Sequence, residues 1–477
     1  MAYKQGENRE QMTLSPLCLD DYIGEDNICR VIDAFVGALD LVKMDFKYAE
    51  PKDNGRPPYD PQAILKLYIY GYTNRVRSSR RLEAEAMRNI EVMWLLEKLA
   101  PDDKTICNFR KDNAKQLKQV FREFSLLCNR LSLYGKELVA VDGTKNRANS
   151  SRKNIHTKKG TEKKLAEIEK KISEYMNELE HNDEAEKSDE KVDNVRVSEI
   201  LEHLKSKKAT LVEWLKKIEE NDDKEISTVD TDAHLMHTNG DGRPLDACYN
   251  VQTVVDAKNK LIVDFEVTTC PDDKGALPEM TERAKEIMGV ETITVVADTG
   301  YYDGEDIEKC EQNGTVTYVA KAGDYAHAPE RNYDKSKFRY DAENDKYICP
   351  QNAVLSRTRT RPDGKREYTN RPACKNCPVR EKCTVGKYRT ISRTSEQDSL
   401  DSNNARMAAN YEIFDERKKI VEHPFGTTKA VWGYKQYLCR GKERTTAEQA
   451  LVFLAYNLRR VINIFKGNGE NLIAAMG

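Results

Sequence analysis

The sequence predicts an α/β fold in which a mixed sheet is covered by flanking helices. Helical periodicity fills the first 130 residues, strand-type runs alternate with helical segments from residue 137 onward, and four cysteines cluster between 349 and 383. The predicted parts are an all-α domain at 1–130, a sheet domain split over 131–160, 226–345 and 395–477, a helical-hairpin insertion at 161–225 and a small Cys-rich insertion at 346–394.

The composition is that of a soluble chain with large solvated faces. Of its 477 residues, 33% are charged and 39% hydrophobic, and the mean hydropathy is −0.76. No apolar run approaches the length of a membrane span, so we expect no membrane partner. The first residues, MAYKQGENREQ, lack the apolar segment of a signal peptide, which predicts a cytoplasmic protein. The twelve cysteines are then expected to be reduced thiols or metal ligands.

The net charge of −2 hides strong local segregation. Basic side chains gather in the stretches 75–81, 145–164 and 357–371, whereas the acid that balances them lies largely in 162–225. Segregation of this kind is typical of a protein that presents basic faces to a phosphate backbone.

Short helices joined by tight turns are predicted for the first 130 residues. Residues 63–76 carry apolar and aromatic side chains at helical spacing, and 80–89 consist of strong helix formers. Thr105 is expected to cap the helix that follows Pro101. The region's basic side chains could belong to a helix-turn-helix DNA reader; they are Arg75, Arg77, Arg80, Arg81, Arg110 and Lys111. The alternative is a helical bundle with a solvated basic face.

Two apolar runs of strand type each end in an aspartate. In ELVAVDGT (137–144) the predicted strand places Asp142 just before a Gly-Thr turn. ITVVADTGY (293–301) has the same pattern, with Asp298 at the end of the predicted strand. Carboxylates held on buried strands suit a divalent cation, because hard cations take oxygen ligands. Each aspartate alone also fits an ordinary turn former. Together they predict a metal site that needs at least one more oxygen ligand.

Strands and helices alternate around these two runs. Strands are predicted at 246–256, 260–268 and 315–321, and helices at 276–289 and 304–314. The insertion repeats apolar side chains mostly every three or four residues over 161–220, on both sides of an acidic break at 183–191. This spacing predicts an antiparallel helical hairpin or coiled coil, interpreted as a surface arm or dimerisation element without chemistry of its own.

The cysteine cluster has the spacing C-x24-C-x2-C-x5-C, formed by Cys349, Cys374, Cys377 and Cys383. Four thiols with basic neighbours are consistent with a tetrahedral structural Zn²⁺ site. The alternative is a set of ordinary reduced cysteines. A redox pair is disfavoured, because no βαβ pattern surrounds Cys374 and Cys377.

The last part of the chain is predicted to be helical and offers three glutamates as the further ligand. Glu448 would lie near the start of a core helix at 446–465, where first-turn dipole compensation is its simplest role. Glu443 stands in a charged loop and is expected to be solvated. Glu422, within the helical stretch 407–434, has no obvious packing role, and residue chemistry prefers it slightly.

The order AVDGT, ADTGY, KKIVEHPFGTTK and LAYNLRR resembles the DDE transposases of bacterial insertion sequences. The resemblance implies a ribonuclease-H-like catalytic domain whose metal ligands are Asp142, Asp298 and Glu422. It also implies two Mg²⁺ or Mn²⁺ ions, cleavage and strand transfer of double-stranded DNA, and a homodimer or higher oligomer on DNA at the nucleoid. If the resemblance holds, these three carboxylates must converge in the folded chain.

The family's Glu-x6-Lys pattern matches Glu422 and Lys429, which places Lys429 near transposon-end DNA by resemblance. The pattern's Tyr and Arg, seven and four residues before the Glu, are replaced here by Asp415 and Lys418. Lys418 keeps the positive charge but lacks the guanidinium fork. Two alternatives stay open: a metal-dependent nuclease of the same fold without strand transfer, and a non-catalytic DNA-binding relative.

Overall fold

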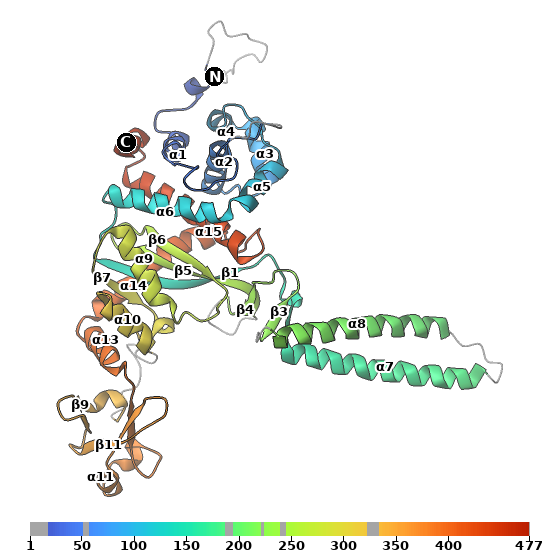
Figure 1. Ribbon diagram of the computed structural model, residues 1–477. Coiled ribbons are helices and arrows are strands. Elements are labelled where there is room, and N and C mark those ends of the chain that lie inside the picture. The colour runs from blue at the N-terminus through green and yellow to red at the C-terminus, as the bar shows by residue number, and fades with distance from the viewer. Residues whose placement is uncertain are drawn as a thin grey trace, which may run out of the picture.

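The computed structural model describes residues 18–50, 57–186, 194–220, 224–238, 245–321 and 333–476. The N-terminal stretch MAYKQGENREQ and residues 187–191 of the acidic break lie outside this range. In Figure 1 a helical layer lies above a central sheet, a two-helix arm projects sideways, and a small β-rich module hangs below. Among the described residues, no helix combines the length and apolar character needed to cross a bilayer.

The central sheet is mixed and confirms the predicted α/β class. Its order is β4-β5-β1-β7-β8, with β6 also paired to β5. β1 runs antiparallel to β5 and parallel to β7, and β7 runs parallel to β8. The strands are β1 (Leu138–Arg147), β4 (His234–Met236), β5 (Asp246–Asp256), β6 (Ile262–Thr268), β7 (Ile293–Ala297) and β8 (Thr315–Val319).

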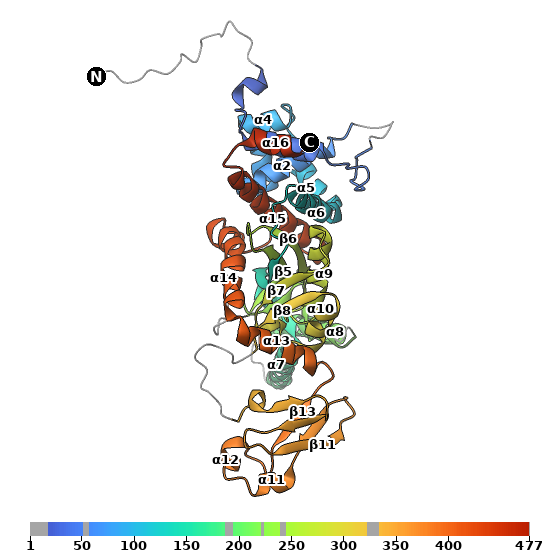
Figure 2. The same ribbon diagram turned by 90° about the vertical axis from the view of Figure 1, so that its left-hand side faces the viewer.

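Helices cover both faces of this sheet, as Figure 2 shows, with α14 on one side and α9 and α10 on the other. The face of α14 that carries Ile420 and Val421 is buried against the sheet. Gly289 ends α9 in the left-handed conformation, at a φ of 67°, as the sequence predicts. These helices are α9 (Ala276–Met288), α10 (Gly304–Gln312), α13 (Gln397–Ala409) and α14 (Tyr411–Phe425).

The helical layer packs on the sheet domain through α15 (Lys442–Ile464), which contacts α2 and α6 on one side and β6 on the other. The cap of α5 differs from the prediction: Asp102, not Thr105, is the N-cap, and its Oδ1 accepts from the Thr105 backbone N at 2.7 Å. The layer consists of α1 (Ile28–Gly37), α2 (Pro61–Thr73), α3 (Ser79–Arg88), α4 (Ile90–Leu95), α5 (Asp103–Asp112), α6 (Ala114–Arg130) and α16 (Gly469–Met476).

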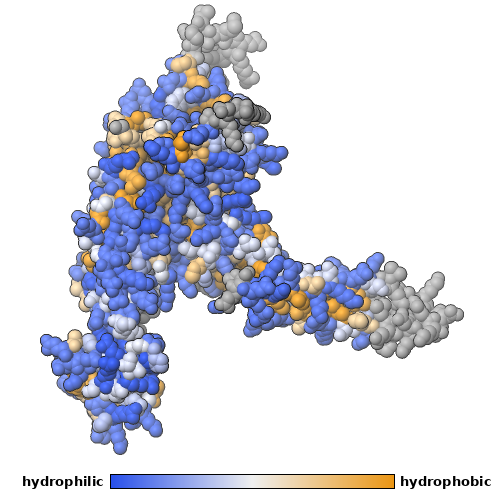
Figure 3. Space-filling model, viewed as in Figure 1, coloured by the Kyte–Doolittle hydropathy of each residue, from blue (hydrophilic) through white to orange (hydrophobic). Residues whose placement is uncertain are grey.

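The arm consists of α7 (Lys158–Glu186) and α8 (Asn194–Glu220), which lie side by side and project from the short strands β2 (Ile155–Thr157) and β3 (Glu225–Ser227). Leu201, Leu211 and Ile218 of α8 are buried. Figure 3 shows apolar side chains along the arm and a mostly hydrophilic body on the same face.

The β-rich module is a second sheet with its own small core. Its strand order is β13-β12-β11-β10-β9, and the aromatic side chains Tyr347 and Tyr368 are buried on it. The module contains β9 (Arg339–Asp341), β10 (Lys346–Ile348), β11 (Val354–Thr360), β12 (Arg366–Thr369), α11 (Arg371–Lys375), α12 (Arg380–Cys383) and β13 (Thr390–Arg393).

Candidate functional site

The two predicted aspartates lie next to each other where the parallel pairing of β1 with β7 ends, Asp142 within β1 and Asp298 just after β7. In the parallel pairing of β1 with β7, Val141 stands opposite Ala297. Asp142 and Asp298 each follow one of these paired residues. Because parallel strands run in the same direction, successive residues reach the same edge together. Register therefore brings together two carboxylates that are far apart in the chain.

The surroundings of Asp142 disfavour its ionised form. Burial raises the pKa of this carboxyl to about 7, and the negative charges of Asp298 and Asp273 add to the rise. Arg417 of α14 opposes the shift, since its guanidinium lies 3.2 Å from Asp142 Oδ2. Asp298 has a different local partner: its Oδ1 accepts from the Gly300 backbone N at 2.9 Å.

The third predicted carboxylate, Glu422, is not brought into a metal-binding set. It occupies an exposed position on α14, whereas Ile420 and Val421 of the same turn are buried. The α14 side chain that reaches Asp142 is Arg417, five residues earlier. Within the described ranges, no three His, Cys, Asp or Glu side chains are arranged to hold a metal ion. The structure thus brings the carboxylates of Asp142 and Asp298 close together, but it does not place the Glu422 carboxylate with them.

Asp273 is a site residue that sequence reasoning missed. It lies in the loop between β6 and α9, and its Oδ1 accepts from Asn250 Nδ2 at 2.7 Å, Gln252 Nε2 at 2.6 Å and Lys145 Nζ at 3.1 Å. The available signal was an Asp-Asp pair four residues after the end of the strand predicted at 260–268. Asp273 ties the loop to β1 and β5 beside the catalytic candidates.

Gly143 permits this close approach, which gives a first testable prediction. A Cβ at Gly143 would lie 2.7 Å from Asp273 Oδ1 and 2.8 Å from Gln252 Nε2. Gly143→Ala should therefore lower the free energy of unfolding by about 1–3 kcal/mol. Gly37→Ala is the matched control, because a Cβ there would meet nothing within 4 Å. Chemical denaturation of both variants checks this, and equal stability of the two would contradict it.

Lys429 lies close to the same edge of β1. Its Nζ donates to Thr144 Oγ1 at 2.6 Å and to the Lys145 carbonyl at 2.7 Å. Burial is the main cause that lowers the pKa of this amine to about 8. Lys418, by contrast, is exposed on α14. The basic group that α14 supplies to Asp142 is thus Arg417. It precedes by one residue Lys418, which stands where the family pattern has its arginine.

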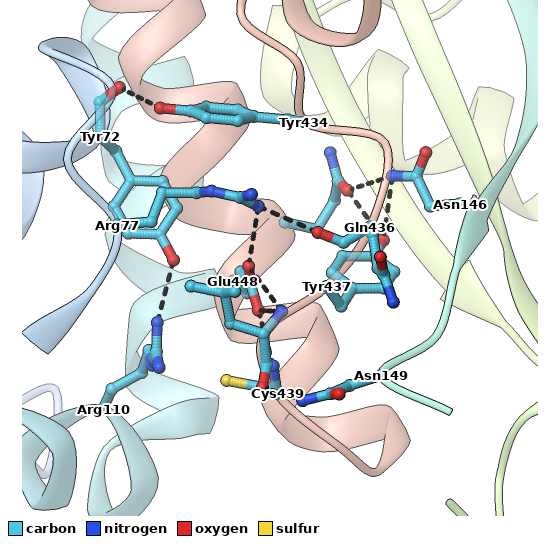
Figure 4. Close-up of polar contacts among 12 residues, drawn as sticks. Tyr72, Arg77, Arg110, Asn146, Asn149, Tyr434, Gln436, Tyr437, Cys439 and Glu448 are labelled. Carbon is cyan, nitrogen blue, oxygen red and sulfur yellow. Dashed lines mark hydrogen bonds and ion pairs between the residues drawn. The ribbon is translucent and has the colours of Figure 1, made fainter. Parts of the chain in front are cut away.

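The four predicted DNA-binding arginines separate into two environments. Arg75, Arg80 and Arg81 are exposed. Arg77 points into the joint between the helical layer and α15, and its side chain is 19% exposed. It lies 3.2 Å from Glu448 Oε1 and stacks over the Tyr434 ring at 4.5 Å (Figure 4). The observed contacts of Arg77 are therefore internal, unlike those of the three exposed arginines.

Glu448 is fully buried at the centre of this joint, with 0% exposure. Its carboxylate accepts from the backbone N of Leu438 and of Cys439 as well as from Arg77. The expected first-turn role is wrong, because α15 begins at Lys442 and Glu448 lies in the second turn. Glu443 is exposed as predicted, but it lies in the first turn of α15 and not in a loop.

The four cysteines of the module line one pocket of about 310 Å³. Burial raises the pKa of the Cys383 thiol, and charge on Cys374, Cys377 or Cys349 would raise it further, so the four sulfur atoms lie within electrostatic reach. The Sγ of Cys349 accepts from the Ala353 backbone N at 3.3 Å. All twelve cysteines are free thiols.

Two family models match the chain. Residues 17–112 match a transposase domain, DUF772, and residues 348–462 match a transposase DDE domain. The first match covers the four arginines, and the second covers the four cysteines, Glu422 and Lys429. Asp142 and Asp298 lie between the two matches. No curated protein and no solved structure matches the chain.

Proposed function

We propose that this chain, which belongs to the DDE transposases of the insertion-sequence type, cleaves and joins double-stranded DNA with Asp142 and Asp298 at its reaction centre. The observation that carries the proposal is the strand register, which sets the two aspartates side by side where the pairing of β1 with β7 ends. A mixed sheet with helices on both faces supports a ribonuclease-H-like catalytic domain. The proposed boundaries are 1–130 for the helical domain and 131–160, 226–345 and 395–477 for the catalytic domain. The helical-hairpin insertion covers 161–225 and the cysteine module 346–394.

The donor chemistry of the two aspartates fits a divalent cation such as Mg²⁺ or Mn²⁺. Both side chains are carboxylates, and the charge of Asp298 disfavours ionisation of Asp142, a penalty that a cation would relieve. Glu422 is proposed as the third ligand from the family pattern, although α14 holds it at an exposed position. When bound, divalent cations would stabilise the oxygens of an in-line phosphodiester displacement and activate the attacking hydroxyl.

The chain's own residues would hold and orient the DNA strand. Arg417 carries a guanidinium beside Asp142, where it favours the ionised carboxylate against the opposing effect of burial. Lys429 places a partly desolvated ammonium at Thr144. The family resemblance places Lys429 near the transposon-end DNA. The exposed cations Arg75, Arg80, Arg81 and Lys418 would meet backbone phosphates at the surface. We propose a homodimer or higher oligomer on DNA at the nucleoid.

A strand-transfer assay tests this function. The protein is incubated with Mg²⁺, a labelled duplex that ends in the terminal repeats flanking its gene, and an unlabelled target duplex. Cleaved ends joined to the target are expected on denaturing gels. Cleavage without joined product would instead indicate a nuclease. Binding without either product, in Mg²⁺ and in Mn²⁺, would indicate a non-catalytic DNA-binding relative.

The cysteine module is proposed to hold one structural Zn²⁺ through Cys349, Cys374, Cys377 and Cys383. The four thiols line one pocket, which supports this set, although as they stand they are not arranged as metal ligands. Metal analysis of the purified protein should give about one zinc per chain. Cys377→Ser should lose this zinc, whereas Cys270→Ser, an exposed cysteine outside the module, should keep it. A zinc-free wild-type protein that is folded would contradict the assignment.

A further inference from the structure

A basic pocket lies between the helical layer and the start of α15. Its volume is about 310 Å³. It is formed by the end of α5, the segment after β1 and the chain that enters α15. Its lining includes four cationic side chains and no acidic one; the cations are Arg110, Lys111, Arg440 and Arg444. We propose that this pocket binds backbone phosphates of the DNA on which the proposed transposase acts, and the inference rests on that function.

Arg110 is the buried part of the pocket wall, with only 8% of its surface exposed. Its Nη1 donates to Tyr72 Oη at 3.0 Å, and its guanidinium lies 5.6 Å from the centre of the Tyr68 ring. These neutral partners fix the side chain without cancelling its charge. A buried guanidinium held in this way retains its attraction for an oxyanion.

The charge of the pocket is not neutralised from within. In the part of the chain that the structure describes, no carboxylate forms an ion pair with any of the four cations. The nearby carboxylate of Glu448 is engaged by Arg77 and by two backbone N–H groups. Buried charges normally have partners of opposite charge, and Arg110 is the buried one of these four cations. An anionic ligand would supply the partner that the chain does not.

The walls of the pocket are tied together by the chain itself. Asn149 Nδ2 donates to the Leu438 carbonyl at 2.6 Å, and Arg440 Nε donates to the Asn149 carbonyl at 3.1 Å. Figure 4 shows Arg110, Asn149 and Cys439 around the Glu448 joint. The cations therefore sit on a framework that is formed before any ligand binds, which reduces the cost of ordering them.

The position of the pocket favours DNA as the source of the phosphate. Asn149 follows Asp142 by seven residues, two of them beyond the end of β1, a span of at most about 23 Å at about 3.3 Å per residue. That distance corresponds to about seven base pairs of duplex at 3.4 Å each. One duplex could thus reach the aspartates and the pocket together, and would contact both the helical layer and the sheet domain.

The test compares salt dependence of duplex binding by full-length variants. Arg440→Gln/Arg444→Gln removes two exposed pocket cations, and Lys170→Gln/Lys171→Gln removes two exposed charges from the arm as a matched control. Affinity for a mixed-sequence duplex is measured over a range of salt concentrations. The pocket variant should bind about tenfold more weakly at low salt, with a log–log slope reduced by about 2, while the arm variant should keep the wild-type slope.

Site-specific thiol labelling separates DNA from a small anion. Cys107 lines the pocket and is exposed, so its alkylation can be followed by peptide mass spectrometry. Duplex should protect Cys107 in the wild type and not in the pocket variant. Equal protection by inorganic phosphate at the same phosphate concentration would assign a small-anion site and overturn the proposal, as would unchanged slopes. A wild type that binds no duplex would instead refute the proposed function itself.

Discussion

Asp142→Asn should abolish divalent-metal-dependent cleavage of a transposon-end duplex, with a rate loss of about 10³-fold or more. The substitution keeps the size of the side chain and removes the charge that a cation needs. Burial and neighbouring carboxylates already disfavour this charge in the folded protein, since they raise the Asp142 pKa to about 7. The fold should therefore tolerate the amide, and duplex binding should persist.

Asp272→Asn is the matched control for this experiment. It makes the same chemical change at an exposed position of the loop that carries Asp273, so its cleavage rate should remain near that of the wild type. Gel analysis of end cleavage and a separate binding titration give the two readouts. Retained cleavage by Asp142→Asn would remove this residue from the reaction centre.

Glu448→Ala should produce the largest loss of stability, about 3–5 kcal/mol in the free energy of unfolding. The side chain is fully buried, and its removal leaves Arg77 and the backbone N–H groups of Leu438 and Cys439 without their acceptor. An unpaired charge in a largely buried joint costs more than the pair contributes. Urea denaturation checks the size of the effect.

Glu443→Ala, one turn earlier and exposed, is the control and should change stability little. Arg77→Ala combined with Glu448→Ala should destabilise by less than the sum of the single variants, because the two side chains share one contact. Full additivity would show that the pair is not coupled. An unaltered denaturation midpoint for Glu448→Ala would refute the structural role of the joint.

These two glutamates and Arg77 show where sequence reasoning stops. Position in a helical pattern led to dipole compensation for Glu448, and the clustering of basic side chains led to DNA binding for Arg77, because neither pattern reveals which distant element covers a residue. Arg77 and Glu448 are separated by 371 positions and meet only when α15 packs against the helical layer. Asp273 was missed for a similar reason, since its partners come from β1 and β5.

The sequence by itself predicted the two apolar strand runs and the alternation of elements around them, but not that β1 continues past Asp142 to Arg147 instead of turning at Gly143 and Thr144. The predicted features depend on local periodicity and apolar runs, which act over a few residues. Only the tertiary structure decided that Val141 pairs with Ala297, and hence that Asp142 and Asp298 meet. It also decided that Arg417, rather than Glu422, faces Asp142, because the packed face of α14 sets which side chains reach the sheet. Strand register and helix orientation arise from long-range packing, which a local pattern does not specify.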